Sequence, residues 1–174
     1  MVTRKDLAVL IDEETLQSRI LELGKQIAAD YEGKDLALIG ILKGCFMFLA
    51  DLSRAIERDC TVDFLGLSSY GAATTSSGVV KITSDLTRPI EGRDVLVVED
   101  IIDTGLTMRY LLENLGTRRP NSVRVCTLLH KPANARCEVP IDYVGFTIED
   151  HFVIGYGLDY AERLRNIPYI GYKP

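Results

Sequence analysis

Several features that would place a protein quickly in a known class are scarce or missing in this sequence. Its 174 residues contain only two histidines and no C-x-x-C pair, so the usual side chains of zinc sites are few. No run approaches the ~20 apolar residues that span a bilayer. The apolar run at residues 7–11 ends in Asp12-Glu13-Glu14, unlike a secretory signal peptide. We therefore expect a soluble, cytoplasmic protein with no membrane partner.

An excess of basic residues is also absent. The chain has 25 acidic and 20 basic residues, a net charge of -5, whereas a general nucleic-acid binder usually carries a basic surface. The hydrophobic fraction of 47% and the charged fraction of 26% are near the globular average. We expect one domain over residues 1–174, large enough to bury a full core, and no nucleic-acid partner.

The cysteines show no pattern typical of cross-linking or of metal binding. Each stands singly within or beside an apolar stretch, at Cys45, Cys60, Cys126 and Cys137. We expect reduced thiols in a reducing compartment rather than disulfides or zinc ligands.

Apolar segments of two kinds alternate along the chain. Runs of strand length occupy residues 8–11, 36–42, 61–67, 79–84, 95–98, 123–129, 142–146 and 152–154. Between them, apolar residues recur at helical spacing. Asp12 is a predicted helix cap, and Gly33 and Gly116 are predicted helix stops. Helices that alternate with buried strands predict an α/β fold, a mostly parallel twisted sheet with helices on both faces.

The residues of one segment, 68–78, are small, polar and uncharged, and a single aromatic residue, Tyr70, lies among them. A segment of this composition buries too little apolar surface to be fixed in one position, so we expect it to be a mobile loop. Together with the strands predicted on either side of it, the segment would form a long hairpin or flap.

The clearest functional pattern is at residues 95–108. Four apolar residues, mostly β-branched, lead directly into Glu99 and Asp100, then into Asp103 and the loop Thr104-Gly105-Leu106-Thr107. Packing does not explain adjacent carboxylates after a buried strand. Open α/β sheets bind ligands at the carboxyl ends of their strands, so this stretch predicts a ligand site.

The loop at residues 104–107 joins this strand to a helix. Backbone amides, two hydroxyls and the positive end of a helix dipole suit a phosphate monoester, although a Thr-Gly turn can also be a simple helix cap. The sequence lacks the G-x-x-x-x-G-K-[ST] and G-x-G-x-x-G motifs, so an anion site here does not indicate a kinase or a dehydrogenase.

The carboxylates define what lies beside this phosphate. Glu99 and Asp100 can accept hydrogen bonds from vicinal hydroxyls or lie near Mg²⁺. A phosphate beside a diol indicates a ribose 5-phosphate unit. Asp103, an anion close to a phosphate, suggests a proton-handling role or a nearby magnesium ion.

Residues 97–107 resemble the phosphoribosyl pyrophosphate motif of the type I phosphoribosyltransferases. The order of further motifs is similar to that in the branch acting on hypoxanthine and guanine, and the likeness covers nearly the whole chain. These motifs are Leu42-Lys43-Gly44, Ser69-Tyr70, Lys131, Phe152-Val153, Asp159 and Arg165. The resemblance implies the type I fold with a small hood and a mobile flap. It also implies a homodimer or homotetramer and a non-proline cis peptide before Lys43.

The implied reaction is a purine salvage step. The 5-phosphoribosyl group would pass from phosphoribosyl pyrophosphate to N9 of hypoxanthine or guanine, with Mg²⁺ as cofactor, giving IMP or GMP and pyrophosphate. The family assigns the ribose hydroxyls to Glu99 and Asp100, and the 5-phosphate to Asp103, Thr104, Gly105, Leu106 and Thr107. Asp103 would also be the general base at the purine N7. The pyrophosphate would meet Lys43, Gly44 and Arg165.

The family also assigns the purine contacts. Lys131 would donate to the 6-oxo group, Phe152 would stack on the base, and Val153 would contact its edge through backbone groups. Asp159 would lie at the purine site and bind magnesium, together with Glu99 and Asp100. Ser69 and Tyr70 would belong to the flap.

Simpler interpretations of individual residues remain. From the local sequence alone, Lys131 is a surface lysine before a proline, Phe152 a core residue and Arg165 a solvated one. Two other functions also compete: a regulator that senses a nucleotide and binds RNA or DNA on the same fold, and a transferase specific for adenine or a pyrimidine. The acidic balance opposes the first, and Lys131 with Phe152 opposes the second.

Overall fold

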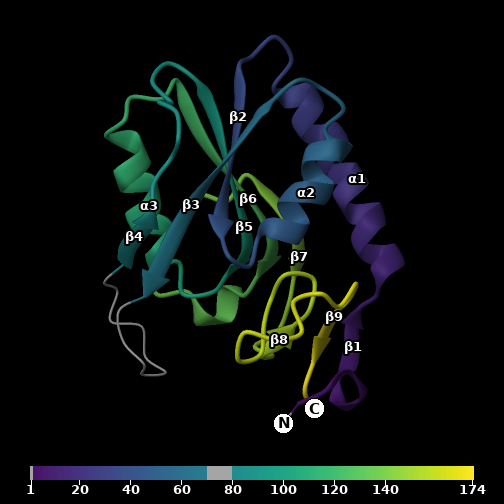
Figure 1. Ribbon diagram of the computed structural model, residues 1–174. Coiled ribbons are helices and arrows are strands. Elements are labelled where there is room, and N and C mark those ends of the chain that lie inside the picture. Colours follow the sequence, from purple (N-terminus) through teal and green to yellow (C-terminus); the bar gives the residue numbers. More distant parts are fainter. Residues whose placement is uncertain (1, 70–79) are drawn as a thin grey trace.

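The computed structural model describes residues 2–69 and 80–174, and its main feature is a six-stranded sheet (Figure 1). Neighbouring strands pair in parallel except for the edge strand β4, which runs antiparallel to β3. The spatial order is β4 (Val80–Ser84), β3 (Thr61–Ser69), β2 (Leu36–Leu42), β5 (Asp94–Ile102), β6 (Ser122–His130) and β7 (Tyr143–Thr147). The prediction of a mostly parallel sheet is confirmed.

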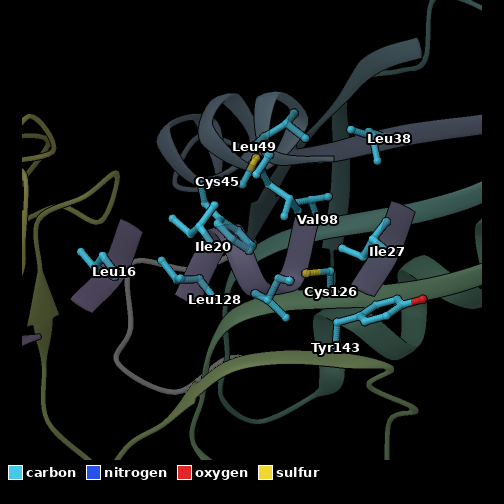
Figure 2. Close-up of a cluster of buried hydrophobic side chains, with 14 of the residues drawn as sticks. Leu16, Ile20, Ile27, Leu38, Cys45, Leu49, Val98, Cys126, Leu128 and Tyr143 are labelled. Carbon is cyan, nitrogen blue, oxygen red and sulfur yellow. The ribbon is translucent and has the colours of Figure 1, made fainter. Parts of the chain in front are cut away.

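Helices cover both faces of this sheet. The helices α1 (Glu13–Asp30) and α2 (Phe46–Ala55) pack on one face, and α3 (Leu106–Gly116) packs on the other (Figure 1). Figure 2 shows the first cluster, in which Ile20 and Leu49 of the two helices meet Val98 of β5. On the opposite face, Val97 packs with Leu111 of α3. Successive residues of one strand thus serve two cores, which explains the uninterrupted apolar runs.

The first helix forms where its sequence pattern predicts. The carboxylate of Asp12 accepts a hydrogen bond from the Thr15 amide at 2.7 Å and caps the helix. Its buried residues recur every three or four positions, and Gly33 follows the end of the helix with a φ of +74°. The cap and the glycine stop are both confirmed.

The central strand β5 is longer than the apolar run that predicts it. Pairing with β6 continues through Glu99↔Thr127 to Ile102↔His130, so Glu99 and Asp100 lie within the strand rather than after it. Acidic residues are disfavoured in strands, but the backbone ladder with β6 overrides this local preference, whereas pairing with β2 ends at Val98.

A second sheet, which we call the hood, lies below the carboxyl edge of the main sheet (Figure 1). It contains β1 (Ala8–Ile11), β9 (Ile170–Tyr172) and β8 (Val153–Ile154), in that order and all antiparallel. The sequence pattern did not predict β9. The strand β8 begins at Val153, one residue later than the predicted run.

The hairpin expected around residues 68–78 is present at its base, where Ser69 pairs with Val80. Tyr70 and the rest of the expected mobile loop through residue 79 lie outside the described residues, so the mobility of this segment stays a prediction. The third helix, the other strands and four free cysteines agree with the sequence patterns. Within residues 2–69 and 80–174, no helix has the length and apolar character needed to cross a membrane.

Candidate active site

The predicted site residues come together at the carboxyl edge of the main sheet. Parallel pairing brings the ends of β2, β5 and β6 to the same edge, and these ends carry Lys43, the loop after Ile102, and Lys131. The segment that joins β8 to β9 of the hood faces this edge, because its Gly157 lies against Gly44 and its Glu162 contacts Lys43.

The turn from β5 into α3 encloses a cavity of about 110 Å³. Its lining includes Glu99, Asp103, Thr104, Gly105 and Thr107. The N-cap of α3 is Gly105, with a φ of +80° that favours glycine. Because glycine offers no capping side chain, the first amides of the helix suit an anion.

A segment behind this turn fixes its shape. The Arg136 amide donates to the Thr104 carbonyl at 2.9 Å. A Cβ on Gly105 would lie 3.0 Å from both the Cys137 carbonyl oxygen and Val139. The turn is therefore held by backbone and steric contacts that leave its cavity side accessible to a ligand.

Asp103 has an unusual environment at the edge of this cavity. Its Oδ1 atom is buried and has no hydrogen-bond partner among the residues that the structure describes. Asp103 also lines a neighbouring cavity of about 180 Å³. A buried carboxylate oxygen without a donor is costly, so Oδ1 of Asp103 is available to a hydrogen-bond donor of a ligand.

The adjacent carboxylates of Glu99 and Asp100 concentrate negative charge inside the protein. Burial, and then the charge of Asp100, raise the pKa of Glu99, which is 8% exposed. Burial also raises the pKa of Asp100. Backbone amides donate to both side chains: Glu99 accepts from the Asp100 amide at 3.3 Å, and Asp100 accepts from the Ile101 amide at 2.9 Å. Hydroxyl donors or a cation would stabilise this pair.

The turn after β2 packs directly on this pair. A Cβ on Gly44 would lie 1.5 Å from Oδ2 of Asp100, and a Cβ on Gly157 would lie 2.0 Å from the Gly44 carbonyl oxygen. Only glycine fits at either position. The peptide between Leu42 and Lys43 is cis, as the family resemblance implies. Sequence reasoning missed Gly157, because its role is visible only in this contact.

Two cations expected to meet pyrophosphate are linked by one carboxylate. The ammonium of Lys43 lies 2.7 Å from Oε2 of Glu162, and Arg165 lies 3.2 Å from Oε1. Arg165 also pairs with Asp159 at 2.8 Å and donates to the Gly157 carbonyl at 2.8 Å. Arg165 is thus not simply a solvated residue. Glu162 is a site residue that the sequence did not reveal.

The residues expected to bind the purine lie nearby. Lys131 is 6% exposed, and its amide donates to the Ile102 carbonyl at 2.9 Å; the surface-lysine interpretation is therefore wrong. Phe152 is 66% exposed and meets the ring of Tyr160 edge-on at 6.1 Å, so it is not a core residue. Val153 is buried in β8.

The expected magnesium ligands are not gathered into a closed cage. In the described part of the chain, no three His, Cys, Asp or Glu side chains form a group that could hold a metal ion. Asp159 is paired with Arg165. Magnesium commonly takes one or two carboxylates and completes its shell with water and substrate oxygens, so the Glu99–Asp100 pair fits such an ion. Ser69 ends β3, and Tyr70 lies outside the described residues.

Comparison with known proteins identifies the class of this site. A model of the phosphoribosyl transferase domain matches residues 12–161, so the chain belongs to the phosphoribosyltransferase family. The hypoxanthine-guanine phosphoribosyltransferase of Mycobacterium avium is 53% identical over 170 residues, which cover 94% of this chain and 84% of that protein. The enzyme of the same name from Bacillus subtilis is 49% identical over 163 residues, covering 94% and 91%.

The fold agrees with these relatives. The crystal structure of a hypoxanthine phosphoribosyltransferase from Staphylococcus aureus superposes with a TM-score of 0.94 and 46% identity, covering 98% of this chain and 93% of that one. The resemblance recognised from residues 97–107 and the type I fold are confirmed. The roles of individual residues stay predictions.

The contact at Gly44 generates a stability prediction. Gly44→Ala places a methyl group on a buried carboxylate, and overpacking of this kind should lower the free energy of unfolding by about 1–3 kcal/mol. Gly116→Ala, at the end of α3 with no atom within 4 Å of the added Cβ, is the control and should change it by less than ~1 kcal/mol. Urea unfolding measures both, and equal effects would contradict the contact.

The buried charge of Glu99 generates a second prediction. Its pKa is raised on folding, so the native state binds this proton more readily than the unfolded chain and loses stability as pH rises through the raised pKa. In metal-free protein, Glu99→Gln should therefore raise the free energy of unfolding at pH 8 by on the order of 1 kcal/mol.

The pH dependence distinguishes this effect from a gain in stability that has another cause. Thermal unfolding should show a rise in Tm of roughly 2–4 °C at pH 8, shrinking toward zero near pH 4.5, where the native carboxyl already holds its proton. Glu113→Gln, on the exposed side of α3, should show neither effect. A gain that is independent of pH would refute the prediction.

Proposed function

We propose that this protein transfers the 5-phosphoribosyl group of phosphoribosyl pyrophosphate to N9 of hypoxanthine or guanine, releasing pyrophosphate and forming IMP or GMP. The observation that carries the proposal is the cavity at the turn of residues 103–107 beside the adjacent carboxylates of Glu99 and Asp100, at one sheet edge. A phosphate site next to a diol site fits a ribose 5-phosphate. The relatives named for this reaction support the same conclusion.

In this proposal the turn after β5 binds the phosphorylated sugar. The amides and hydroxyls of Thr104, Gly105, Leu106 and Thr107 hold the 5-phosphate, with the dipole of α3 behind them. Glu99 and Asp100 accept hydrogen bonds from the ribose hydroxyls. Fixing both ends of the ribose orients its anomeric carbon toward the base.

The leaving pyrophosphate meets the turn after β2. It would be bound by Lys43, the Gly44 backbone and Arg165. Pyrophosphate would then replace the Glu162 carboxylate beside the two cations. Magnesium, held near Glu99, Asp100 and Asp159, would supply charge neutralisation for the departing group. For Asp159 this requires that Arg165 turn from it toward pyrophosphate.

The base enters between the hood and the end of β6. Lys131 donates to the 6-oxo group, Phe152 stacks on the ring, and backbone groups of Val153 meet its edge. N9 forms the bond to the anomeric carbon as the bond to pyrophosphate breaks. Asp103, whose buried Oδ1 lacks a donor among the described residues, accepts the proton that leaves N7.

A substrate panel tests this function directly. With phosphoribosyl pyrophosphate and Mg²⁺, the protein should turn over hypoxanthine and guanine and should discriminate against adenine, whose 6-amino group is a donor facing the donor-only Lys131. Release of pyrophosphate and formation of IMP or GMP are measured. Absence of turnover with every 6-oxopurine would rule out the proposal.

Asp103→Asn tests the proton acceptor. The substitution keeps the size of the side chain and removes its basicity, so kcat should fall roughly 100-fold or more, while the Kd for phosphoribosyl pyrophosphate changes little. Single-turnover kinetics and calorimetry separate the two quantities. A loss of binding as large as the loss of turnover would assign Asp103 to the phosphate site instead.

Removal of the metal tests the cofactor. Chelation should abolish turnover, and added Mg²⁺ should restore it. Asp100→Asn should raise the Mg²⁺ concentration needed for half-maximal rate, because it removes one of two adjacent carboxylates. Full activity in excess chelator would exclude magnesium dependence.

The family also supports a location and an assembly. We propose the cytoplasm and a homodimer or homotetramer, as the resemblance implies. Light scattering on the purified protein measures the assembly.

A further inference from the structure

The side chain of Lys131 is long and flexible, yet it lies almost wholly inside the protein. Lysine reaches through four rotatable bonds and carries a strongly hydrated charge. Burying that charge is costly unless another group compensates it. The proposed contact with the 6-oxo group also demands a defined position for the ammonium. We therefore expect a neighbouring residue that both compensates the charge of the Lys131 ammonium and fixes its position.

Asp150 meets both requirements. Its Oδ1 atom lies 3.3 Å from the ammonium of Lys131 and accepts a hydrogen bond from the side-chain amide of Asn134 at 2.8 Å. These two donors, Asn134 first, hold the pKa of Asp150 below its usual range, so the carboxylate is charged at neutral pH. The backbone N–H of Asn134 in turn donates to the Lys131 carbonyl at 3.3 Å. The three residues thus form a closed set.

This set joins the two segments that would hold the purine. Lys131 and Asn134 follow β6, whereas Asp150 stands two residues before the exposed ring of Phe152. The Asp150 carboxylate therefore connects Lys131, the expected donor to the edge of the base, with the segment that carries Phe152, the ring expected to stack on the base. The side chain of Asp150 is 62% exposed, so it retains much of its own hydration while it serves a buried partner.

We propose that Asp150 is a positioning residue that fixes the Lys131 ammonium against the 6-position of the purine and so sets the preference for 6-oxopurines over 6-aminopurines. This inference rests on the proposed function. An ammonium has hydrogen-bond donors and no acceptor. A fixed Lys131 therefore favours binding of a 6-oxopurine and disfavours binding of a 6-aminopurine. Without Asp150 the side chain would move, and both effects would weaken.

Asp150→Ala is the principal variant, with Glu149→Ala as its matched control. Glu149 is the adjacent acidic residue, is exposed, and lies 3.6 Å from His151 rather than near Lys131. Charged hydrogen bonds contribute enough that Asp150→Ala should raise the KM for hypoxanthine about tenfold. The ratio of kcat/KM for hypoxanthine over adenine should fall by a similar factor. The Kd for phosphoribosyl pyrophosphate should stay within about twofold of the unsubstituted value, showing that the fold and the sugar site are intact.

Two further variants separate positioning from a general structural role. Asp150→Glu keeps the charge and should recover part of the preference, while Asp150→Asn should fall between Asp150→Ala and the unsubstituted enzyme. In a double-mutant cycle with Lys131→Met, the effect of Asp150→Ala on the KM for hypoxanthine should disappear, because Asp150 acts through Lys131. Additive effects in this cycle would overturn the inference.

The outcomes distinguish this inference from the function on which it rests. If the unsubstituted protein turns over no 6-oxopurine, the proposed function fails. If the unsubstituted protein does turn over a 6-oxopurine, and Asp150→Ala behaves like Glu149→Ala, the proposed function stands and the role of Asp150 is refuted. A parallel loss of affinity for hypoxanthine and phosphoribosyl pyrophosphate would also refute it, because that pattern indicates general disruption.

Discussion

The parallel pairing of β5 with β2 and β6 is the constraint on which the site depends. The pairing with β6 carries the strand past the end of the apolar run and holds Glu99 and Asp100 inside the protein, where their charges are poorly solvated. It also brings the ends of three strands to one edge, so that the turns carrying Lys43 and Lys131 lie beside the turn carrying Asp103. A strand that serves two cores thus supplies the reactive groups as well.

Charge is arranged around this edge in opposing sets. The end of β5 carries the adjacent carboxylates of Glu99 and Asp100, while two cations nearby are each held by an acidic partner: Lys43 by Glu162, and Lys131 by Asp150. In the proposed reaction, pyrophosphate oxygens would replace Glu162 beside Lys43, whereas Asp150 would stay beside Lys131 when the purine binds. The unliganded protein therefore keeps its cations ordered, and binding rearranges existing ion pairs instead of creating them from solvated side chains.

Local patterns predicted the parts of the structure that depend on burial. Strands on both sides of β5 and the three helices follow from apolar runs and helical spacing. The 103–107 turn was recognisable because its chemistry is contiguous in sequence. Other features depend on contacts between distant residues: β9 pairs with β1 at the opposite end of the chain, as at Ala8↔Tyr172, Gly157 matters through Gly44, and Glu162 through Lys43. None of these contacts leaves a local pattern.

The order of strands in the hood makes the two ends of the chain unequal. β9 is the middle strand and pairs with both β1 and β8, whereas β1 is an edge strand with one neighbour. Loss of residues 170–174 would leave two strands without their partner, including the strand that begins at Val153. Loss of residues 2–11 would remove an edge strand and one core residue, Ile11. Tolerance to truncation should therefore be lower at the carboxyl end, although both ends contribute to the same small sheet.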